Sequence, residues 1–583
     1  MAPAPPQHAF NFSSSFLPNP SQAKQLRQLA RSPGRAPLET GCLRATIASS
    51  PRDLVLYDKN IAILKGAVER MLVERELLQQ YADDCRTVLS PIRQLPSETL
   101  VEIFMLACPA PSLYNDEGNI KARAPLDGID HLVKNDLLEL AKVCSRWHAL
   151  IVGTPILWDT LDIDYTRSPV RPTKALVQAA LDRSANVPLK IGVTALEQGA
   201  APDPDPDVLE LLAKHSKRWE TAMFLMDTRH YASLSAAKGN LPLLRTASVE
   251  EGAFDRSDAA IRAATEAVEM FASAPRLTNF TYAGALSALK RLPWEQLQRF
   301  EYYGVDVEDL REVLAVLPRL AEGTCFTLSS VDFLDTPELL TLPSVMSQLG
   351  ELTVSVLTQS YPNNCIETFL TALTLPKVEV LKFLSADNPM MYPLSWPNAS
   401  FQEFLARSGC AEHLTSLNFQ HVAISTETLV DLLELLPALE VLGVADHPTP
   451  EKVDRPYSYT NNIEAVVTNA LLRRLIHTPA ATCLVPELRS FTCTSTLDFN
   501  DWVLLDFVSS RARALPGGGF HCVVRWLEQF EWFDGVRGRR NQRHINHVVQ
   551  AKLEELGETH GLRTRFVAAT PVKKMDLYDL GRH

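Results

Sequence analysis

The first extended hydrophobic pattern in the chain covers residues 51–88. A stripe of apolar residues spaced three and four apart predicts a long amphipathic helix over residues 51–89. Arg75 interrupts the stripe, which lasts about three heptads. Two interpretations follow: the helix packs on the next domain, or it forms a short coiled coil through which two chains associate weakly. The stripe consists of Leu54, Tyr57, Ile61, Leu64, Val68, Met71 and Leu78.

Pro91 ends the preceding helix. A compact helical unit is predicted to follow, over residues 90–165. A second helix of this unit is predicted over residues 135–152. The connection at 109–135 is rich in Pro, Gly and Asp, and it predicts a surface loop inserted into the unit. The first helix carries its apolar stripe at i, i+3, i+4 and i+7, on Leu100, Ile103, Phe104 and Ala107.

A different sequence pattern begins near residue 187 and continues to residue 569. Short apolar segments recur there, most of them opened by a proline or a polar turn. Alternating, strand-like stretches such as Leu439–Val444 follow them, and amphipathic helices such as Thr426–Leu435 precede several of them. Units of helix and strand at this spacing predict an irregular leucine-rich-repeat-like solenoid over residues 187–569. The polar residues 570–583 predict a frayed C-terminus.

The termini and the composition narrow the class of protein. Residues 1–50 are rich in Ser and Pro, which predicts a disordered tail. The net charge of -12 argues against nucleic-acid binding and against binding to an anionic membrane surface. No run of 18 apolar residues exists, so no membrane span is expected. The ten cysteines form no CxxC pair, which is typical of reduced thiols in the cytoplasm or nucleus.

The sequence offers no motif for catalysis or for a cofactor. It has no Gly-rich phosphate loop, no HExxH, no GxSxG and no kinase signature. His544 and His547 lie three residues apart without a third ligand, so no metal site is predicted. His521 and Cys522 adjoin in a predicted strand and point to opposite faces, which predicts an exposed histidine and a core cysteine. We therefore expect a protein that is not an enzyme and binds no cofactor.

The helical unit resembles the F-box, whose pattern is approximately LPxExLxxIF, a loop, VCxxWxxL and a terminal LW. The corresponding segments here are Leu95–Leu100, Ile103-Phe104, Val143–Leu150 and Leu157-Trp158. The lead-in Ser-Pro-Ile-Arg and the exit Thr-Pro-Ile-Leu-Trp are similar to the large F-box families of mushroom-type (basidiomycete) fungi. The gap between Phe104 and Val143 is wider than the usual F-box loop.

This resemblance implies a binding function. In the family, the three-helix unit packs its apolar surface on the small adaptor subunit of SCF ubiquitin ligases, and through it on the cullin. About half of the nine matching residues are expected to be mainly structural, because a small unit needs its own core. Leu95, Pro96 and Phe104 are the preferred interface residues. The nine adaptor-binding candidates are Ile92, Leu95, Pro96, Leu100, Ile103, Phe104, Val143, Cys144 and Trp147.

The fold class expected from the sequence is therefore a helical F-box unit followed by an α/β repeat, with a tail and a long helix before them. The resemblance implies a substrate receptor that recruits a protein target, of unknown identity, for ubiquitination. An alternative is a scaffold that binds proteins outside any ubiquitin ligase. An enzyme of unrecognised fold would instead require a deep polar pocket with convergent titratable groups.

Overall fold

The computed structural model divides the chain into two compact units, Met1–Leu100 and Val101–His583, and each is described by itself. The described residues are 19–31, 40–108, 135–165, 173–195, 203–251, 258–303, 310–332, 342–358, 365–385, 394–449, 462–478, 483–514, 519–526, 530–533, 536–539, 544–560 and 562–568. The predicted insert and the predicted frayed C-terminus therefore lie outside the described residues, apart from residue 135.

The first unit is dominated by one long helix. Helix α2 (Thr40–Leu89) is 50 residues long, and it follows the shorter α1 (Pro20–Arg31). The helix begins at Thr40 rather than at the predicted residue 51, and α1 also lies in the stretch that was predicted to be disordered. Pro51 removes one backbone hydrogen bond, but Leu43 and Ile47 continue the apolar spacing ahead of it, and the helix runs through the proline.

The second unit opens with short helices and continues as one large sheet. Helix α3 (Ser97–Ala107) crosses the boundary between the units, and η2 (Pro91–Gln94) precedes it. The later helices of the opening segment are α4 (Asn135–Ala141), α5 (Ser145–Gly153) and η3 (Pro155–Trp158).

The sheet has fourteen strands, and every strand pairs in parallel with its neighbours. The strands follow one another across the sheet in chain order, so each connection moves the chain on by one strand. They are β1 (Thr160–Asp164), β2 (Leu189–Ala195), β3 (Trp219–Met226), β4 (Thr246–Glu250), β5 (Asn279–Ala283), β6 (Arg299–Tyr303), β7 (Cys325–Asp332), β9 (Glu351–Thr358), β11 (Val380–Ser385), β13 (Ser416–Gln420), β15 (Val441–Ala445), β18 (Ser490–Ser495), β19 (His521–Trp526) and β22 (Arg563–Ala568).

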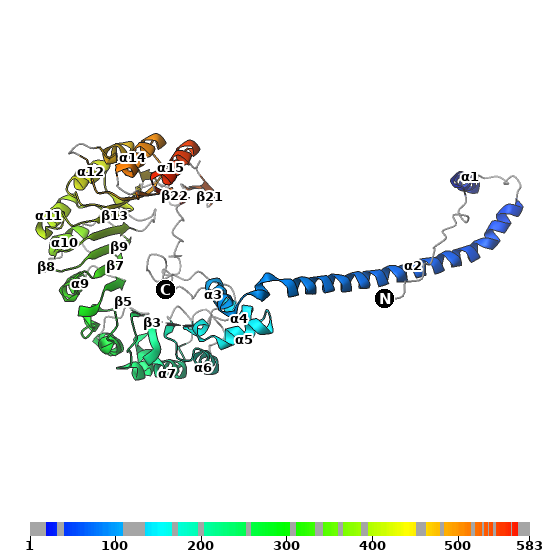
Figure 1. The fold of residues 1–583 in the computed structure, drawn as a ribbon, viewed down its shortest axis with the longest axis horizontal. Coiled ribbons are helices and arrows are strands. Elements are labelled where there is room, and N and C mark those ends of the chain that lie inside the picture. The colour runs from blue at the N-terminus through cyan, green and yellow to red at the C-terminus, as the bar shows by residue number, and fades with distance from the viewer. Residues whose placement is uncertain are drawn as a thin grey trace. The chain divides into compact units, whose positions relative to one another are not determined.

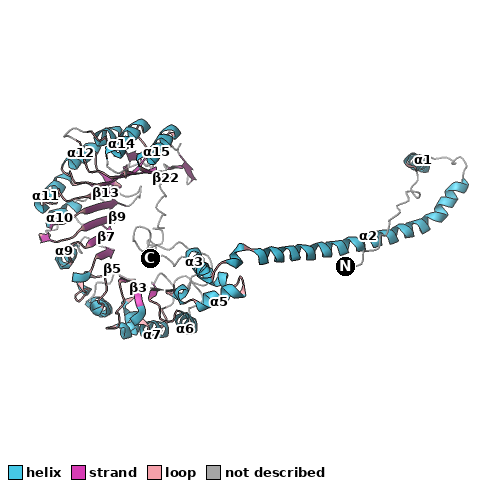
Figure 2. Cartoon of the chain, viewed as in Figure 1, coloured by secondary structure: helices cyan, strands magenta, loops and turns pink. Residues whose placement is uncertain are grey.

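Helices cover one face of this sheet. Figures 1 and 2 show the strands of the second unit on the inner side of an arc and the helices on its outer side. The α-helices are α6 (Lys174–Arg183), α7 (Pro206–Lys214), α8 (Asp258–Val268), α9 (Leu310–Val316), α10 (Cys365–Ala372), α11 (Asn398–Ser408), α12 (Thr426–Glu434), α13 (Asn469–Leu475), α14 (Asp501–Ala514) and α15 (His547–His560). Shorter turns of 3₁₀-helix are η4 (Ser216–Arg218), η5 (Thr228–Ala237), η6 (Glu269–Ser273), η7 (Leu286–Ala288), η8 (Trp294–Gln296) and η10 (Leu317–Arg319).

Four two-stranded pairs lie outside the large sheet. They are β8 (Val345–Met346) with β10 (Leu373–Thr374), β12 (Leu394–Ser395) with β14 (Val422–Ala423), β16 (His447–Thr449) with β17 (Asn462–Glu464), and β20 (Phe530–Phe533) with β21 (Val536–Arg539).

The core of the body lies between the sheet and the outer helices. Alternate residues of each strand point to this side, as the two-residue period requires. Phe280, Phe300 and Phe326 occupy matching positions on neighbouring strands, and their rings stack at 6.3 and 5.7 Å between centroids. Phe383 and Phe419 stack in the same way at 6.1 Å. Because every strand continues the row of its neighbour, the core is continuous along the sheet.

Local sequence signals set several helix ends. The Asp205 side chain accepts a hydrogen bond from the Asp207 amide at 3.0 Å, and Pro206 occupies the first turn of α7, where no amide donor is needed. The Ser425 hydroxyl caps α12 by accepting from the Thr428 amide at 3.1 Å. Gly409 ends α11 in the left-handed conformation, with φ of 64°.

A buried arginine holds one of the connections in place. Arg511 of α14 is only 1 % exposed and donates hydrogen bonds to the carbonyl oxygens of Leu475, Leu484 and Val485 at 2.7–2.8 Å. Val485 has a φ of 44°, a left-handed conformation that is strained for a β-branched residue. The three hydrogen bonds from the guanidinium therefore stabilise a turn whose backbone conformation is unfavourable for Val485.

Replacement of Arg511 by alanine should destabilise the protein by about 3–5 kcal/mol, because three buried carbonyl groups lose their donor. Chemical denaturation of the full chain measures this change. Arg513, two residues later on the same helix, is exposed, so Arg513→Ala should change the unfolding free energy by less than about 0.5 kcal/mol. Equal effects of the two substitutions would contradict the assigned role.

Candidate functional site

The helical segment that begins at residue 91 is the candidate binding site. Helix α3 starts after Pro96, and the Leu100 amide donates to the Pro96 carbonyl at 3.1 Å to close its first turn. Glu98 lies in this first turn, where a carboxylate interacts favourably with the helix dipole. The predicted first helix is therefore present over residues 97–107.

The second predicted helix, over residues 135–152, is wrong in one respect: it is two helices. The amides of Lys142 and Val143 bond three residues back, to Glu139 and Leu140, which tightens the last turn of α4. Cys144 is then fully extended, with φ of -163° and ψ of 165°, before α5 begins. The apolar spacing continues through this break, so the hydrophobic pattern could not reveal it.

The nine sequence candidates differ in exposure. Leu100 and Phe104 are completely buried, at 0 % exposure. Phe104 packs edge-on against Trp147, with 4.9 Å between ring centroids, and so joins α3 to α5. The exposed candidates are Pro96 and Val143. The half-buried candidates are Ile92, Leu95, Ile103, Cys144 and Trp147.

Two exposed apolar residues, Met105 and Leu106, are not among the nine candidates. Leu106 is 82 % exposed and Met105 is 40 % exposed, both near the end of α3, and Val143 at the helix break is 60 % exposed. The sequence does contain a signal for exposed apolar residues here. Residues 103–107 are apolar without interruption, and one buried stripe accounts for only part of such a run. Exposed apolar side chains on a short helical unit indicate a surface for protein binding.

The helical segment continues into the body without a linker. Trp158 is buried, and its indole Nε1 donates to the Ile151 carbonyl at 2.8 Å. The Arg183 guanidinium of α6 lies 4.6 Å from the centre of the Trp158 ring, at cation–π distance. Strand β1 begins two residues later, at Thr160, and pairs with β2. Helix α5 is thereby joined directly to the start of the sheet.

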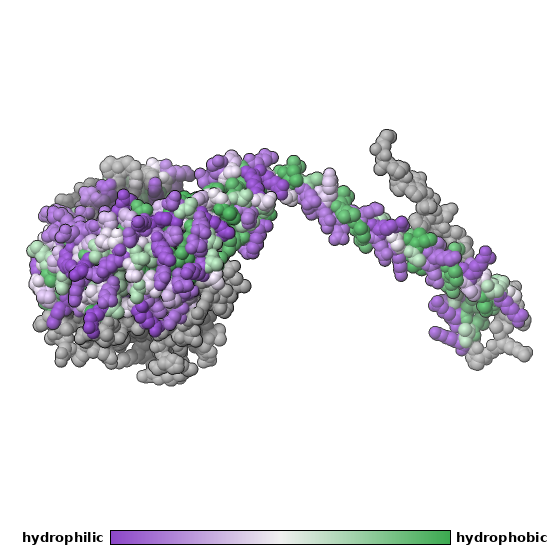
Figure 3. Space-filling model, turned by 90° about the horizontal axis from the view of Figure 1, so that it is seen from below, coloured by the Kyte–Doolittle hydropathy of each residue, from purple (hydrophilic) through white to green (hydrophobic). Residues whose placement is uncertain are grey.

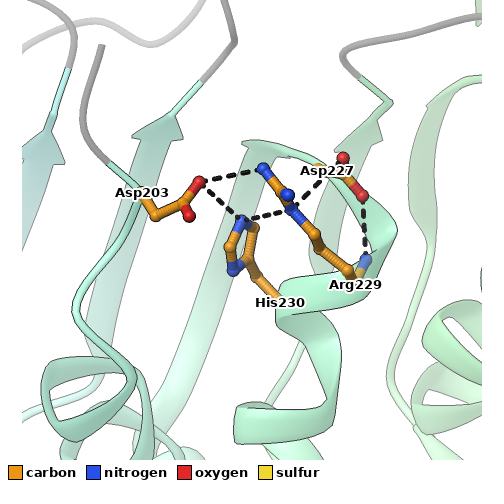
Figure 4. A network of polar contacts seen from close by, with 4 residues as sticks. All are labelled: Asp203, Asp227, Arg229 and His230. Carbon is orange, nitrogen blue, oxygen red and sulfur yellow. Dashed lines mark hydrogen bonds and ion pairs between the residues drawn. The ribbon is translucent and has the colours of Figure 1, made fainter. Parts of the chain in front are cut away.

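A surface network of charged residues lies farther along the body (Figure 4). The Arg229 guanidinium contacts Asp203 Oδ1 at 2.9 Å, and His230 Nε2 lies 3.5 Å from the same oxygen. The Asp227 carboxylate accepts from the Arg229 amide at 3.0 Å and caps η5. These four residues include no serine, threonine or cysteine nucleophile, and three of them are well exposed. We interpret the network as a link between the segment that enters α7 and the start of η5.

A second group of titratable residues is buried at the end of β4. The Tyr282 hydroxyl donates to Glu251 Oε1 at 2.7 Å. Gly284 has a φ of 157°, and a side chain there would lie 2.7 Å from both groups. Burial raises the pKa of Glu250 and of Glu251 to about 7. Burial also raises the pKa of Tyr231 well above its usual value, with a smaller contribution from the two carboxylates.

Other sequence predictions concern metal ligands and the His-Cys pair. Within the described ranges, no group of three His, Cys, Asp or Glu side chains is placed to hold a metal ion. His521 is exposed and Cys522 is buried, as predicted, and burial raises the pKa of the Cys522 thiol to about 12. None of the helices in the described segments is both long and apolar enough to cross a membrane.

Comparison with protein-family models matches residues 92–164 to the F-box-like family. The match begins just before α3 and ends on the last residue of β1, so it covers the helical segment and its junction with the sheet. No curated protein matches the chain. An F-box-like domain supports a role in protein interaction.

The buried carboxyls predict a pH dependence of stability. Their folded pKa of about 7 exceeds the ordinary value of 4.5, so their contribution is present below about pH 4.5 and is lost as the pH rises through 7. The double variant Glu250→Gln, Glu251→Gln should therefore be more stable than wild type at pH 8 by about 2–4 kcal/mol. Chemical denaturation at pH 5 and pH 8 measures the difference.

Glu210→Gln is the control, because Glu210 is exposed. It should leave the pH profile unchanged. A profile of the double variant that parallels wild type between pH 5 and pH 8 would show that the two carboxyls ionise normally in the folded protein.

Proposed function

We propose that this chain is a substrate receptor of an SCF ubiquitin ligase. The observation that carries the proposal is the F-box-like match at residues 92–164, on a helical segment with exposed apolar residues. Apolar side chains on short helices are a common means of docking into a groove of another protein. The adaptor subunit of the ligase would bind this segment, and the cullin would be reached through it.

The burial pattern sorts the candidate residues into two roles. In the proposal Leu100 and Phe104 are structural, since a side chain with no exposed surface is not offered to a partner. The adaptor contact then falls on candidates with exposed surface, and it gains two residues from the end of α3. The proposed contact set is Ile92, Leu95, Pro96, Ile103, Met105, Leu106, Val143, Cys144 and Trp147.

The proposal assigns the body to a leucine-rich-repeat-like solenoid that recruits the target. Its support is the order of the fourteen parallel strands, each continuing the row of the strand before it, with helices on the outer side (Figure 1). The inner face of the sheet presents half-buried polar side chains such as Ser416, Asn418 and Gln420. A concave sheet face of this kind suits binding of another protein.

The chain itself needs no catalytic group in this proposal. Binding a target beside the ligase raises the effective concentration of its lysines near the conjugating enzyme. The acyl transfer belongs to other subunits. The proposal places the chain in the cytoplasm or nucleus, where thiols stay reduced, since its ten cysteines form no CxxC pair.

Co-purification with the adaptor subunit tests the proposal. The variant Leu106→Asp plus Val143→Asp should lose binding by about 100-fold or more, because two charges would be desolvated in the interface. Both residues are exposed, so the variant should keep the unfolding free energy of wild type within about 1 kcal/mol. The matched control is Leu176→Asp plus Leu435→Asp, two leucines that are 47 % and 43 % exposed on the body.

The control variant should bind like wild type. Retention of adaptor binding by the folded Leu106→Asp, Val143→Asp variant would refute the proposed contact set. Wild-type protein that recovers neither adaptor nor cullin would refute the ligase role. Recovery of the adaptor without the cullin would favour a scaffold that acts outside ubiquitination.

A further inference from the structure

The apolar stripe of helix α2 is longer than the sequence alone indicated. The helix is continuous from Thr40 to Leu89, so the spacing of three and four can be followed on both sides of the predicted segment. This alternating spacing continues without interruption for seven heptads. Its seam positions are Leu43, Ile47, Ser50, Leu54, Tyr57, Ile61, Leu64, Val68, Met71, Arg75, Leu78, Ala82, Cys85 and Leu89. Only Ser50 and Arg75 are polar among these fourteen positions.

Most of this seam faces solvent in the single chain. Ile47, Leu54, Met71 and Leu78 are 72, 62, 68 and 69 % exposed. Figure 3 shows apolar (green) surface recurring between polar (purple) surface along the whole helix. A 50-residue helix with this much exposed apolar surface gains little stability from packing, so a partner is expected.

The period of the stripe identifies the kind of partner. An apolar repeat of seven drifts by about 20° per heptad around a straight helix, hence by about 140° over seven heptads. A fixed surface cannot follow such a winding stripe. A second helix can, because two helices with the same repeat supercoil around each other and keep their seams in contact. Seven heptads also exceed the three to four that sustain a coiled coil.

The two polar seam positions select the orientation. A parallel, in-register pair places Arg75 against Arg75 of the second copy, and it places Asp53 beside Asp58 across the edge of the seam. Both contacts oppose like charges. The contact between the two Arg75 side chains lies in the seam itself, and it disfavours the parallel pair.

An antiparallel pair centred between Ile61 and Leu64 removes the first conflict. In this register Arg75 lies opposite Ser50 of the second copy, so the two polar seam residues meet each other. Between residues 43 and 82, every other layer joins apolar residues: Ile47 with Leu78, Leu54 with Met71, Ile61 with Leu64, Val68 with Tyr57, and Ala82 with Leu43. A shift by one heptad in either direction places Arg75 or Ser50 against an apolar residue.

One pair of charges beside the seam is attractive in the same register. Asp58 lies next to Lys65 of the second copy, and by symmetry this pair occurs twice. Asp53 approaches Glu74 of the second copy, so Asp53 meets a like charge in both orientations and Arg75 decides between them. Polar seam residues that meet each other, as Arg75 and Ser50 do twice by symmetry, fix register in coiled coils.

We propose that helix α2 forms an antiparallel two-stranded coiled coil with a second copy of this chain. At 1.5 Å per residue, the two Leu89 residues would lie about 80 Å apart, at opposite ends of the pair. The two helical segments that follow would then leave the coil at different ends. The proposal does not depend on the function of those segments.

The first test is the mass of the full chain in solution, by light scattering after size-exclusion chromatography. Wild type should have twice the mass of one chain. Ile61→Asp plus Leu64→Asp, at the centre of the seam, should have the mass of one chain. Leu56→Asp plus Ile63→Asp is the matched control, since these residues are 45 and 55 % exposed on the same helix but lie outside the seam. The control should remain a dimer.

The second test is the orientation, in chains that carry Cys42→Ser and Cys85→Ser. Oxidation of a mixture of Ile61→Cys chains and Leu64→Cys chains should yield the disulfide between unlike chains. A parallel pair would instead join two Leu64→Cys chains. That product, a wild-type monomer, a trimer, or equal effects of the two Asp variants would each overturn the proposal.

Adaptor co-purification with the same Asp variants separates this inference from the proposed function. The monomeric seam variant should still bind the adaptor, because its substitutions lie outside residues 92–158. A dimer that never binds the adaptor would leave the coiled coil standing and refute only the ligase role.

Discussion

Parallel pairing in register is the constraint on which the body depends. An inner parallel strand relies on a neighbour on each side for its hydrogen bonds and on a covered face for its apolar side chains. The register from β1 to β22 keeps the apolar row on the helix side, as Phe280, Phe300 and Phe326 show. The other row is free to carry polar residues. A polar inner face is thus a consequence of the same pairing that builds the core.

The helical segment inherits its position from this sheet. Trp158 lies at the junction, where it contacts both the end of α5 and the guanidinium of Arg183, and the chain becomes β1 two residues later. The segment thus has no flexible connection to the body.

Much of the fold could be predicted from the sequence wherever a single physical rule determines the local structure. Helix α12 was predicted over Thr426–Leu435 and is found over Thr426–Glu434, because Ser425 caps it and its apolar period is regular. The start of α2 was missed because proline usually ends a helix, and the seam before Pro51 was not followed. The break at Cys144 could not be foreseen, since it depends on backbone conformation rather than on side-chain spacing.

The candidate site was likewise predictable from the sequence only in part. The motif located the segment, but it could not separate core from surface, because Phe104 and Leu106 are equally apolar and only packing distinguishes them. Hydrogen–deuterium exchange of the full chain with and without the adaptor subunit tests the central claim directly. Slower exchange over residues 92–107 and 142–151 on addition of the adaptor, with the strands of the body unchanged, is the predicted result. Unchanged exchange in both segments, at adaptor concentrations that saturate a known receptor, would contradict it.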